Sequence, residues 1–147
     1  MTHRTWLGLN EQRAKYRRAW SAFFQEWDVL LCPPIATAAL PHMQEGNTWD
    51  RTVPVNGRAI PYNDMLFWPG LTDGYHLPAS IAPLGFTRAG LPLGVQIAGP
   101  IYGDRTTIAV AGMLGQAWLG FKAPDGAVSP PASSSISTAT SAVSAST

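Results

Sequence analysis

Side chains that could act as metal ligands or nucleophiles are widely spaced along this chain. The nitrogen and sulfur candidates are three histidines and one cysteine, at His3, His42, His76 and Cys32. None of their separations matches the short ligand pairs that hold zinc in proteins. Cys32 ends an apolar run, where a thiol packs as a small hydrophobe more often than it acts as a nucleophile. The sequence therefore predicts no metal site and no cofactor.

Serine nucleophiles and lysine bases are also not brought together by the sequence. Ser21 and Ser80 each stand without a local base, and the run at 133–135 is serine without glycine. The lysines are Lys15 and Lys122. A serine hydrolase needs a base within hydrogen-bond reach of its nucleophile. We therefore predict that no residue of this chain is catalytic.

The composition predicts one folded unit with little charge on its surface. The chain has 147 residues, of which 46% are hydrophobic and 13% are charged. Charged residues are thus at about half of their usual share, and the six tryptophans indicate apolar faces that another segment covers. The net charge of +1 gives no reason to expect nucleic acid or an acidic membrane as partner. The single cysteine and the lack of a signal-peptide or membrane-span pattern predict a cytoplasmic protein.

An aromatic stripe predicts a long helix near residues 3–26. At about 100° per residue, one side of this helix carries Trp6, Leu9, Tyr16, Trp20, Phe23, Phe24 and Trp27. Glu11, Lys15 and Arg18 fall on the opposite face. Arg13 falls inside the stripe. Either the aliphatic part of its side chain packs at the edge of the stripe with the guanidinium in water, or the guanidinium forms a partly buried ion pair with a carboxylate from another part of the fold.

Two strand patterns follow this helix. Residues 28–32 are uniformly apolar after Asp28, which predicts a short strand covered on both faces and ended by two prolines. Residues 35–50 carry few signals and are expected to form a long loop. Residues 52–55 and 58–60 flank Asn56-Gly57, a pair typical of the type I′ turn. We therefore predict a hairpin there.

The second half predicts helix, strand, strand and helix in that order. A helix is expected over 62–71, and two strands over 79–83 and 93–98 are separated by turn-forming Gly85, Gly90 and Pro92. The last helix is expected from Asp104, as N-cap, to about Leu119. Ile108, Ala111, Gly115 and Trp118 lie along one side of this helix, and Gly120-Phe121 suits a C-terminal cap. From Ala127 onward, the sequence lacks charged and aromatic residues, so we expect a disordered tail over 127–147.

Three stretches in this order resemble the C-terminal third of the amidase-signature family. They are WDVLLCPP at 27–34, LPASIAPLGFTRAGLPLGVQIAGP at 77–100, and the helix that begins at Asp104. Within the second stretch, Gly90 to Gln96 matches the family's GLP-x-G-x-Q motif residue by residue. The resemblance covers residues 1–126 and implies an α/β fold, in which part of a mixed sheet is flanked by helices.

The family resemblance implies amide chemistry whose catalytic residues this sequence does not contain. Family members use a serine nucleophile, a second serine on a cis peptide bond and a lysine base, with an oxyanion loop rich in Gly and Ser. That loop precedes everything matched here. We therefore expect the C-terminal part of an amidase that hydrolyses carboxylic amides, inactive alone. The alternatives are a non-catalytic module or split-gene half that completes a separate N-terminal amidase chain, and part of a protein like the A subunit of a glutamine amidotransferase.

The resemblance also implies a contribution to the substrate pocket. The helix before the LPA stretch holds Tyr62, Asp64 and Trp68, and in glutamine-using members an acidic residue near Asp64 contacts the substrate amine. The simpler alternatives are first-turn helix stabilisation for Asp64 and core packing for Trp68. Gln96 lies in an apolar strand and is expected to bond to backbone. Partners implied are a small amide substrate and, because apolar area is left uncovered, either a second copy or an N-terminal amidase half.

Overall fold

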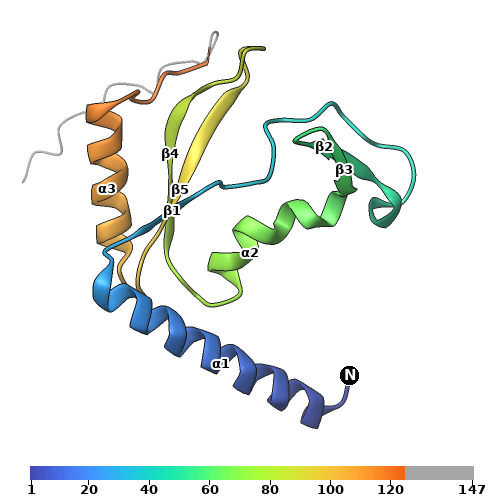
Figure 1. Cartoon of the computed structure of the whole chain (residues 1–147), viewed down its shortest axis with the longest axis vertical. Helices are drawn as coiled ribbons and strands as arrows, with labels where there is room; N and C mark the ends of the chain where they lie inside the picture. The colour runs from blue at the N-terminus through green and yellow to red at the C-terminus, as the bar shows by residue number, and fades with distance from the viewer. Residues whose placement is uncertain (125–147) are drawn as a thin grey trace, which may run out of the picture.

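A three-stranded antiparallel sheet forms the centre of the fold, with helices on both sides of it (Figure 1). The computed structural model describes residues 1–124. The sheet has the order β1-β5-β4, and its strands are β1 (Leu30–Cys32), β5 (Pro92–Ala98) and β4 (Ala79–Phe86). Helix α3 (Asp104–Ala117) packs on β4 and β5, while α2 (Phe67–Asp73) lies on the other side. The predicted α/β class is confirmed, and the strand pairs in the described residues are antiparallel.

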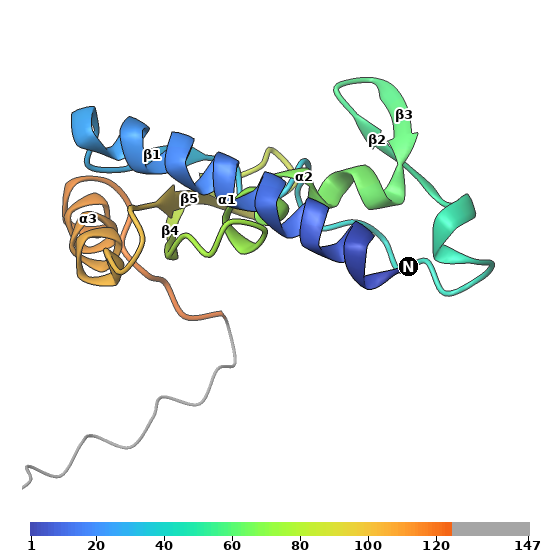
Figure 2. The same cartoon turned by 90° about the horizontal axis from the view of Figure 1, so that it is seen from below.

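The predicted N-terminal helix is confirmed as α1 (His3–Glu26). The Thr2 hydroxyl caps it by accepting from the Thr5 N–H at 3.2 Å. In Figure 1 α1 is a long rod below the sheet and α2, and Figure 2, seen from below, shows it running across in front of them. None of its residues is buried. Arg13 is half-buried, and its Nη2 donates to Asn10 Oδ1 at 2.7 Å. The partner of this guanidinium is therefore an amide one turn earlier in the same helix.

The predicted hairpin is confirmed as β2 (Thr52–Val55) and β3 (Arg58–Pro61). Its turn residues Asn56 and Gly57 have φ of 51° and 76°, as a type I′ turn requires. A short 3-10 helix, η1 (Thr48–Asp50), interrupts the long loop that precedes it.

The helix predicted at 62–71 divides into a 3-10 helix, η2 (Tyr62–Leu66), followed by α2. Pro69 explains the division. A proline inside an α-helix removes a hydrogen bond and clashes with the carbonyl four residues earlier, whereas the first turn tolerates it. Starting the α-helix at Phe67 places Pro69 in that first turn.

The two strands of the family motif are confirmed, and both are longer than predicted. At the turn between them the Thr87 N–H donates to the Leu91 carbonyl at 2.8 Å. Gly90 adopts the positive φ of this turn, +79°. A register irregularity lies between Pro83 and Gly85, where Gly85 has φ +152°. The glycines thus serve the turn and the bulge.

Three details of the sequence-based expectation are wrong. Leu31 in β1 is 50% exposed, because α3 covers β4 and β5 and leaves the β1 edge bare. The N-cap of α3 is Gly103, and Asp104 is the first helical residue. Helix α3 itself turns Thr107 inward and leaves Ile108 and Trp118 exposed. The helix ends before Trp118, and Phe121 is 82% exposed instead of packing at a Gly120 cap.

Two further expectations relate to the chain ends and to membranes. The tail expected over 127–147 lies outside the described residues. Within the described part, no helix has the length and apolar character needed to cross a membrane.

Candidate functional site

Gln96 connects the motif strand to the helix that carries the predicted substrate residues. Its side chain is 4% exposed, and Nε2 donates to the Trp68 carbonyl at 3.3 Å and to Cys32 Sγ at 3.4 Å. The predicted structural hydrogen bond from Gln96 to backbone is therefore confirmed. Because these contacts join β5, β1 and α2, one buried amide fixes how the η2–α2 segment lies against the sheet.

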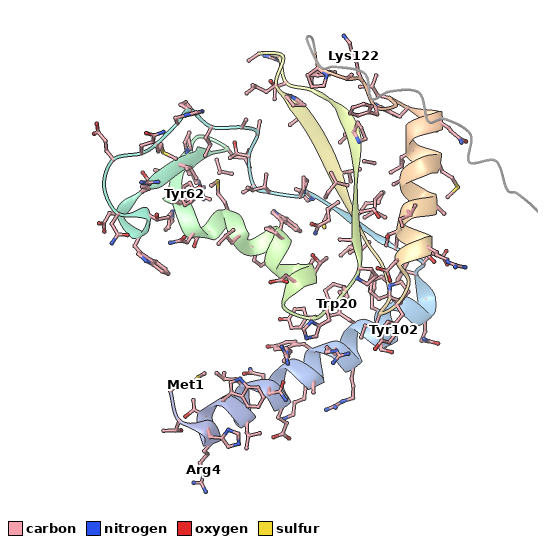
Figure 3. The ribbon with its side chains drawn as sticks, turned by 180° about the vertical axis from the view of Figure 1, so that it is seen from behind. Met1, Arg4, Trp20, Tyr62, Tyr102 and Lys122 are labelled. Atoms are coloured by element: carbon pink, nitrogen blue, oxygen red, sulfur yellow. The ribbon has the colours of Figure 1, made fainter. Side chains whose placement is uncertain are left out.

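A pocket of about 350 Å³ lies between the loop that follows β1 and the start of η2. Residues of the loop at 35–43 line one side, and Arg51, Tyr62 and Met65 line the other. The Tyr62 N–H donates to the Arg51 carbonyl at 2.9 Å, which holds the two sides of the hairpin base together. Met65 is 5% exposed and belongs to the core. Figure 3 shows Tyr62 where the hairpin runs into η2.

The three predicted substrate residues are on one segment but do not all face this pocket. Tyr62 lines it, whereas Asp64 and Trp68 are outside its lining. Asp64 is exposed, and its backbone carbonyl accepts from the Phe67 N–H. Trp68 is half-buried and packs edge-on against Phe67, with ring centroids 5.1 Å apart. The pocket thus holds one of the three side chains, and the other two lie further along the same segment.

Two polar residues of the pocket were not predicted from the sequence. His42 and Arg51 both line it. The Arg51 guanidinium donates from Nε to the Glu45 carbonyl at 3.3 Å and from Nη2 to the Gly46 carbonyl at 3.1 Å. Arg51 therefore ties the loop at residues 45–46 to the start of the hairpin. The one sequence feature near this contact that predicts a turn is Gly46, which has φ +70° in the structure. At this turn the Glu45 and Gly46 carbonyls both accept from Arg51.

A second, larger hollow of about 740 Å³ lies on the other side of the same loop. It is lined mainly by apolar groups, from the loop at 31–39, the hairpin turn at 54–56 and β5 at 92–95. Residues Ile35 and Thr37 to Ala39 line both hollows. The loop after β1 is therefore the shared wall of two hollows, a smaller one that includes the polar side chains His42 and Arg51 and a larger one that is mainly apolar.

The serine with the best-defined surroundings has a structural role. Ser80 Oγ lies 2.9 Å from Thr107 Oγ1, and Thr107 Oγ1 donates to the Asp104 carbonyl at 2.9 Å. Thr107 is 1% exposed, so this pair fastens α3 to β4. Lys122 is exposed and lies at the top of the view in Figure 3, away from Tyr62. Across residues 1–124, no group of three or more His, Cys, Asp or Glu side chains is placed to hold a metal ion.

Comparisons with known proteins agree on one family. The family model described as Amidase matches residues 1–108. The glutamyl-tRNA(Gln) amidotransferase A subunit of Granulibacter bethesdensis is 35% identical over 112 residues, which are 76% of this chain and 20% of that protein. The acylamidase of Rhodococcus erythropolis is 34% identical over 82 residues, which are 54% of this chain and 16% of that protein. The chain therefore spans about a fifth of the length of these relatives.

The fold comparison extends this likeness to three dimensions. A solved structure described as "An unexpected vestigial protein complex reveals the evolutionary origins of an s-triazine catabolic enzyme" superposes with a TM-score of 0.66 at 21% identity. The match covers 80% of this chain and 25% of that one. At this identity the likeness is one of fold.

Proposed function

This chain belongs to the amidase family, and we propose that it forms the C-terminal part of an enzyme that hydrolyses carboxylic amides. The observation that carries the proposal is the Gln96 bridge. It ties the GLP-x-G-x-Q strand to the Trp68 carbonyl, and so to the segment that contributes Tyr62 to a pocket. The chain's task in this proposal is to hold that pocket wall in place.

In this proposal the reacting groups come from a preceding amidase segment. A neutral lysine takes a proton through a bridging serine, the nucleophilic serine attacks the amide carbonyl, and backbone N–H groups hold the oxyanion. The described residues support this division of labour. Ser80 is bonded to Thr107, and Lys15 is exposed on α1. Neither residue is placed as a nucleophile or as its base.

We further propose that Tyr62, Asp64 and Trp68 form the acyl-side wall of the substrate pocket. Asp64 is exposed at the start of the segment, which leaves its carboxylate free to accept from the amine of an amino-acid amide. Most of the matched relatives are A subunits of glutamyl-tRNA(Gln) amidotransferases, which favours an amide of this kind, such as glutamine.

A second candidate function is a non-catalytic module that completes a separate N-terminal amidase chain. The similar solved structure is described as a vestigial protein complex, which supports association between chains in this fold. In both candidates the amidase unit is residues 1–126, the protein is cytoplasmic, and its ligand is a small amide and not a nucleic acid.

Ammonia release from the purified chain is the first test. We expect no turnover of glutamine or a simple acyl amide, because no nucleophile–base pair is formed within the described residues. Turnover that disappears in Ser80→Ala would contradict the proposal.

The second test joins this chain to the upstream four-fifths of the Granulibacter relative, in place of that protein's own C-terminal part. We expect glutamine hydrolysis, and Asp64→Asn should raise the KM for glutamine about tenfold or more, since a hydrogen bond to a charged group contributes ~1.5–3 kcal/mol. Asp73→Asn, an equally exposed change at the end of α2, is the matched control. Equal KM values for both variants would remove Asp64 from the site and leave the family role intact.

A further inference from the structure

The pocket at the start of η2 is lined by hydrogen-bond donors and by one positive charge. Thr37, His42, Arg51 and Tyr62 supply the polar part of its lining, and the other lining residues are apolar. Within the described residues, no Asp or Glu side chain takes part in this lining. Because a guanidinium is always charged, the pocket attracts anions and repels cations. We call this pocket of about 350 Å³ the Arg51 pocket.

The acidic residues near this pocket do not pair with its positive charge. Glu45, Asp50 and Asp64 are close to the pocket residues in sequence, but all three are exposed and lie outside the lining. Within residues 1–124, the hydrogen bonds of the Arg51 guanidinium go to two backbone carbonyls, and neither involves a carboxylate. Exposed charges at the rim are also screened by salt. An anion that enters the Arg51 pocket therefore meets a guanidinium that is free to pair with it.

The Arg51 guanidinium is fixed in direction before any ligand binds. Its Nε donates to the Glu45 carbonyl at 3.3 Å, and its Nη2 donates to the Gly46 carbonyl at 3.1 Å. Of the five N–H groups of a guanidinium, two on Nη1 and one on Nη2 then remain. These belong to the edge of the planar group that binds a carboxylate through two parallel hydrogen bonds. Because the loop carbonyls already hold the side chain, little side-chain entropy is lost when this edge binds a ligand.

Tyr62 and the apolar lining determine the size and character of the ligand. The Tyr62 N–H donates to the Arg51 carbonyl at 2.9 Å, which keeps the backbones of the two residues adjacent. The phenol of Tyr62 is a further O–H donor, and Leu40 and buried Met65 add apolar wall. Small-molecule sites in proteins have volumes of about 300–1,000 Å³, so this pocket is at the small end of that range. It therefore suits a short carbon chain that ends in a carboxylate.

We propose that the Arg51 pocket binds the carboxylate of a small amide, so that the parent enzyme prefers amides whose acyl part carries a carboxylate. Arg51 determines this specificity through a bidentate ion pair, and the Tyr62 hydroxyl donates to the same carboxylate. A neutral acyl amide leaves these donors without an acceptor and binds more weakly. The substrate class depends on the amide hydrolysis proposed above, whereas the carboxylate site is formed by the described residues and can be tested by binding alone.

A nuclear magnetic resonance titration of the intact chain with two matched amides tests the site. Succinamate carries a carboxylate where butanamide, which has the same chain length, carries a methyl group. We expect succinamate to shift the backbone amide signals of residues 37–43, Arg51 and Tyr62 in a saturable way. Its dissociation constant should be at least about tenfold lower than that of butanamide, because hydrogen bonds between charged groups are among the stronger ones.

Variants of Arg51 and Tyr62 show which side chains cause this preference. Arg51→Gln should remove it, and Arg51→Lys should restore part of it, because lysine keeps the charge but lacks the planar group. Arg58→Gln is the matched control and should bind succinamate like the wild type, since Arg58 is exposed in the same hairpin and lies outside the lining. Arg51→Gln also loses the contacts to the loop carbonyls, so Tyr62→Phe provides a second variant that leaves them in place. Tyr62→Phe should weaken succinamate binding by about threefold to tenfold and leave butanamide binding unchanged.

Equal binding of the two amides, no saturable binding of succinamate, or equal succinamate binding by Arg51→Gln and Arg58→Gln would each overturn the proposal. Loss of succinamate binding when the chain is joined to the upstream part of the Granulibacter relative would also overturn it, because a carboxylate of that protein would then occupy the Arg51 pocket. If the joined protein binds succinamate through Arg51 but hydrolyses no amide, the proposed function fails and the carboxylate site stands.

Discussion

Replacing Gln96 by methionine should weaken the attachment of the η2–α2 segment to the sheet while leaving the volume of the core nearly unchanged. The amide nitrogen of Gln96 makes two contacts, to the Trp68 carbonyl at 3.3 Å and to Cys32 Sγ at 3.4 Å. Methionine is similar in length but donates no hydrogen bond.

The magnitude follows from these two contacts. Loss of a neutral hydrogen bond lowers the free energy of unfolding by ~0.5–1.5 kcal/mol, and a buried carbonyl left without that donor costs ~1–3 kcal/mol in the worst case. The contact to sulfur is weak, and methionine regains some apolar burial. We therefore expect Gln96→Met to destabilise the chain by about 2 kcal/mol.

Urea denaturation followed by circular dichroism measures this change, with Gln116→Met on the exposed side of α3 as the matched control. The control should change stability by less than about 0.5 kcal/mol. Hydrogen exchange should also show faster exchange of α2 amides in Gln96→Met, because the bridge ends on Trp68. If the two variants have equal stabilities and equal exchange in α2, the idea that one buried amide holds the pocket wall is wrong.

Three further predictions concern backbone, packing and thiol access. Gly57→Ala should lower the melting temperature, with a loss of about 1 kcal/mol in the free energy of unfolding, because Gly57 has φ +76°. Gly112→Ala in the middle of α3 should raise the free energy of unfolding by a similar amount. In neither position does the added Cβ meet an atom within 4 Å, so the backbone conformation decides the sign. Thr107→Val should destabilise the chain by about 1–2 kcal/mol in urea denaturation, because Ser80 Oγ loses its partner at 2.9 Å; a neutral result would contradict the role given to this pair. Cys32 is 7% exposed and should react with a colorimetric thiol reagent only as the chain unfolds, so fast labelling of the native chain would contradict its burial.

The elements that the sequence predicted well are those with local physical causes. Asn56-Gly57 determines the hairpin turn by itself, because few other residue pairs adopt positive φ twice in succession. The α1 stripe predicts a helix because its spacing repeats over more than six turns. Gln96 was recognised because a lone amide in an apolar strand needs a partner, and the structure supplies the Trp68 carbonyl.

The errors arise where a distant contact decides the local structure. Helical spacing groups Ile108 and Trp118 on one side of α3, but it does not say which side faces the sheet. The structure turns Thr107 inward, because its hydroxyl bonds Ser80, which lies 27 positions earlier in the sequence. The pocket residues Arg51 and His42 were missed for the same reason, since their role depends on a loop that folds back on the hairpin base. No pattern of neighbouring residues contains such information.

The distribution of buried and exposed side chains connects these observations. The most deeply buried positions are apolar Ile97, Val53, Ala82 and Ala98 together with polar Thr107 and Gln96, while large side chains such as Trp49 and Trp118 are 78% and 73% exposed. Apolar packing and the hydrogen bonds of Gln96 and Thr107 together hold the elements in place, and much apolar area stays exposed. A free-standing domain of this size normally shows the opposite pattern, with its large apolar residues inside. Within the amidase family this pattern fits a unit whose own contacts fix its geometry and whose exposed apolar side chains pack against a neighbouring surface.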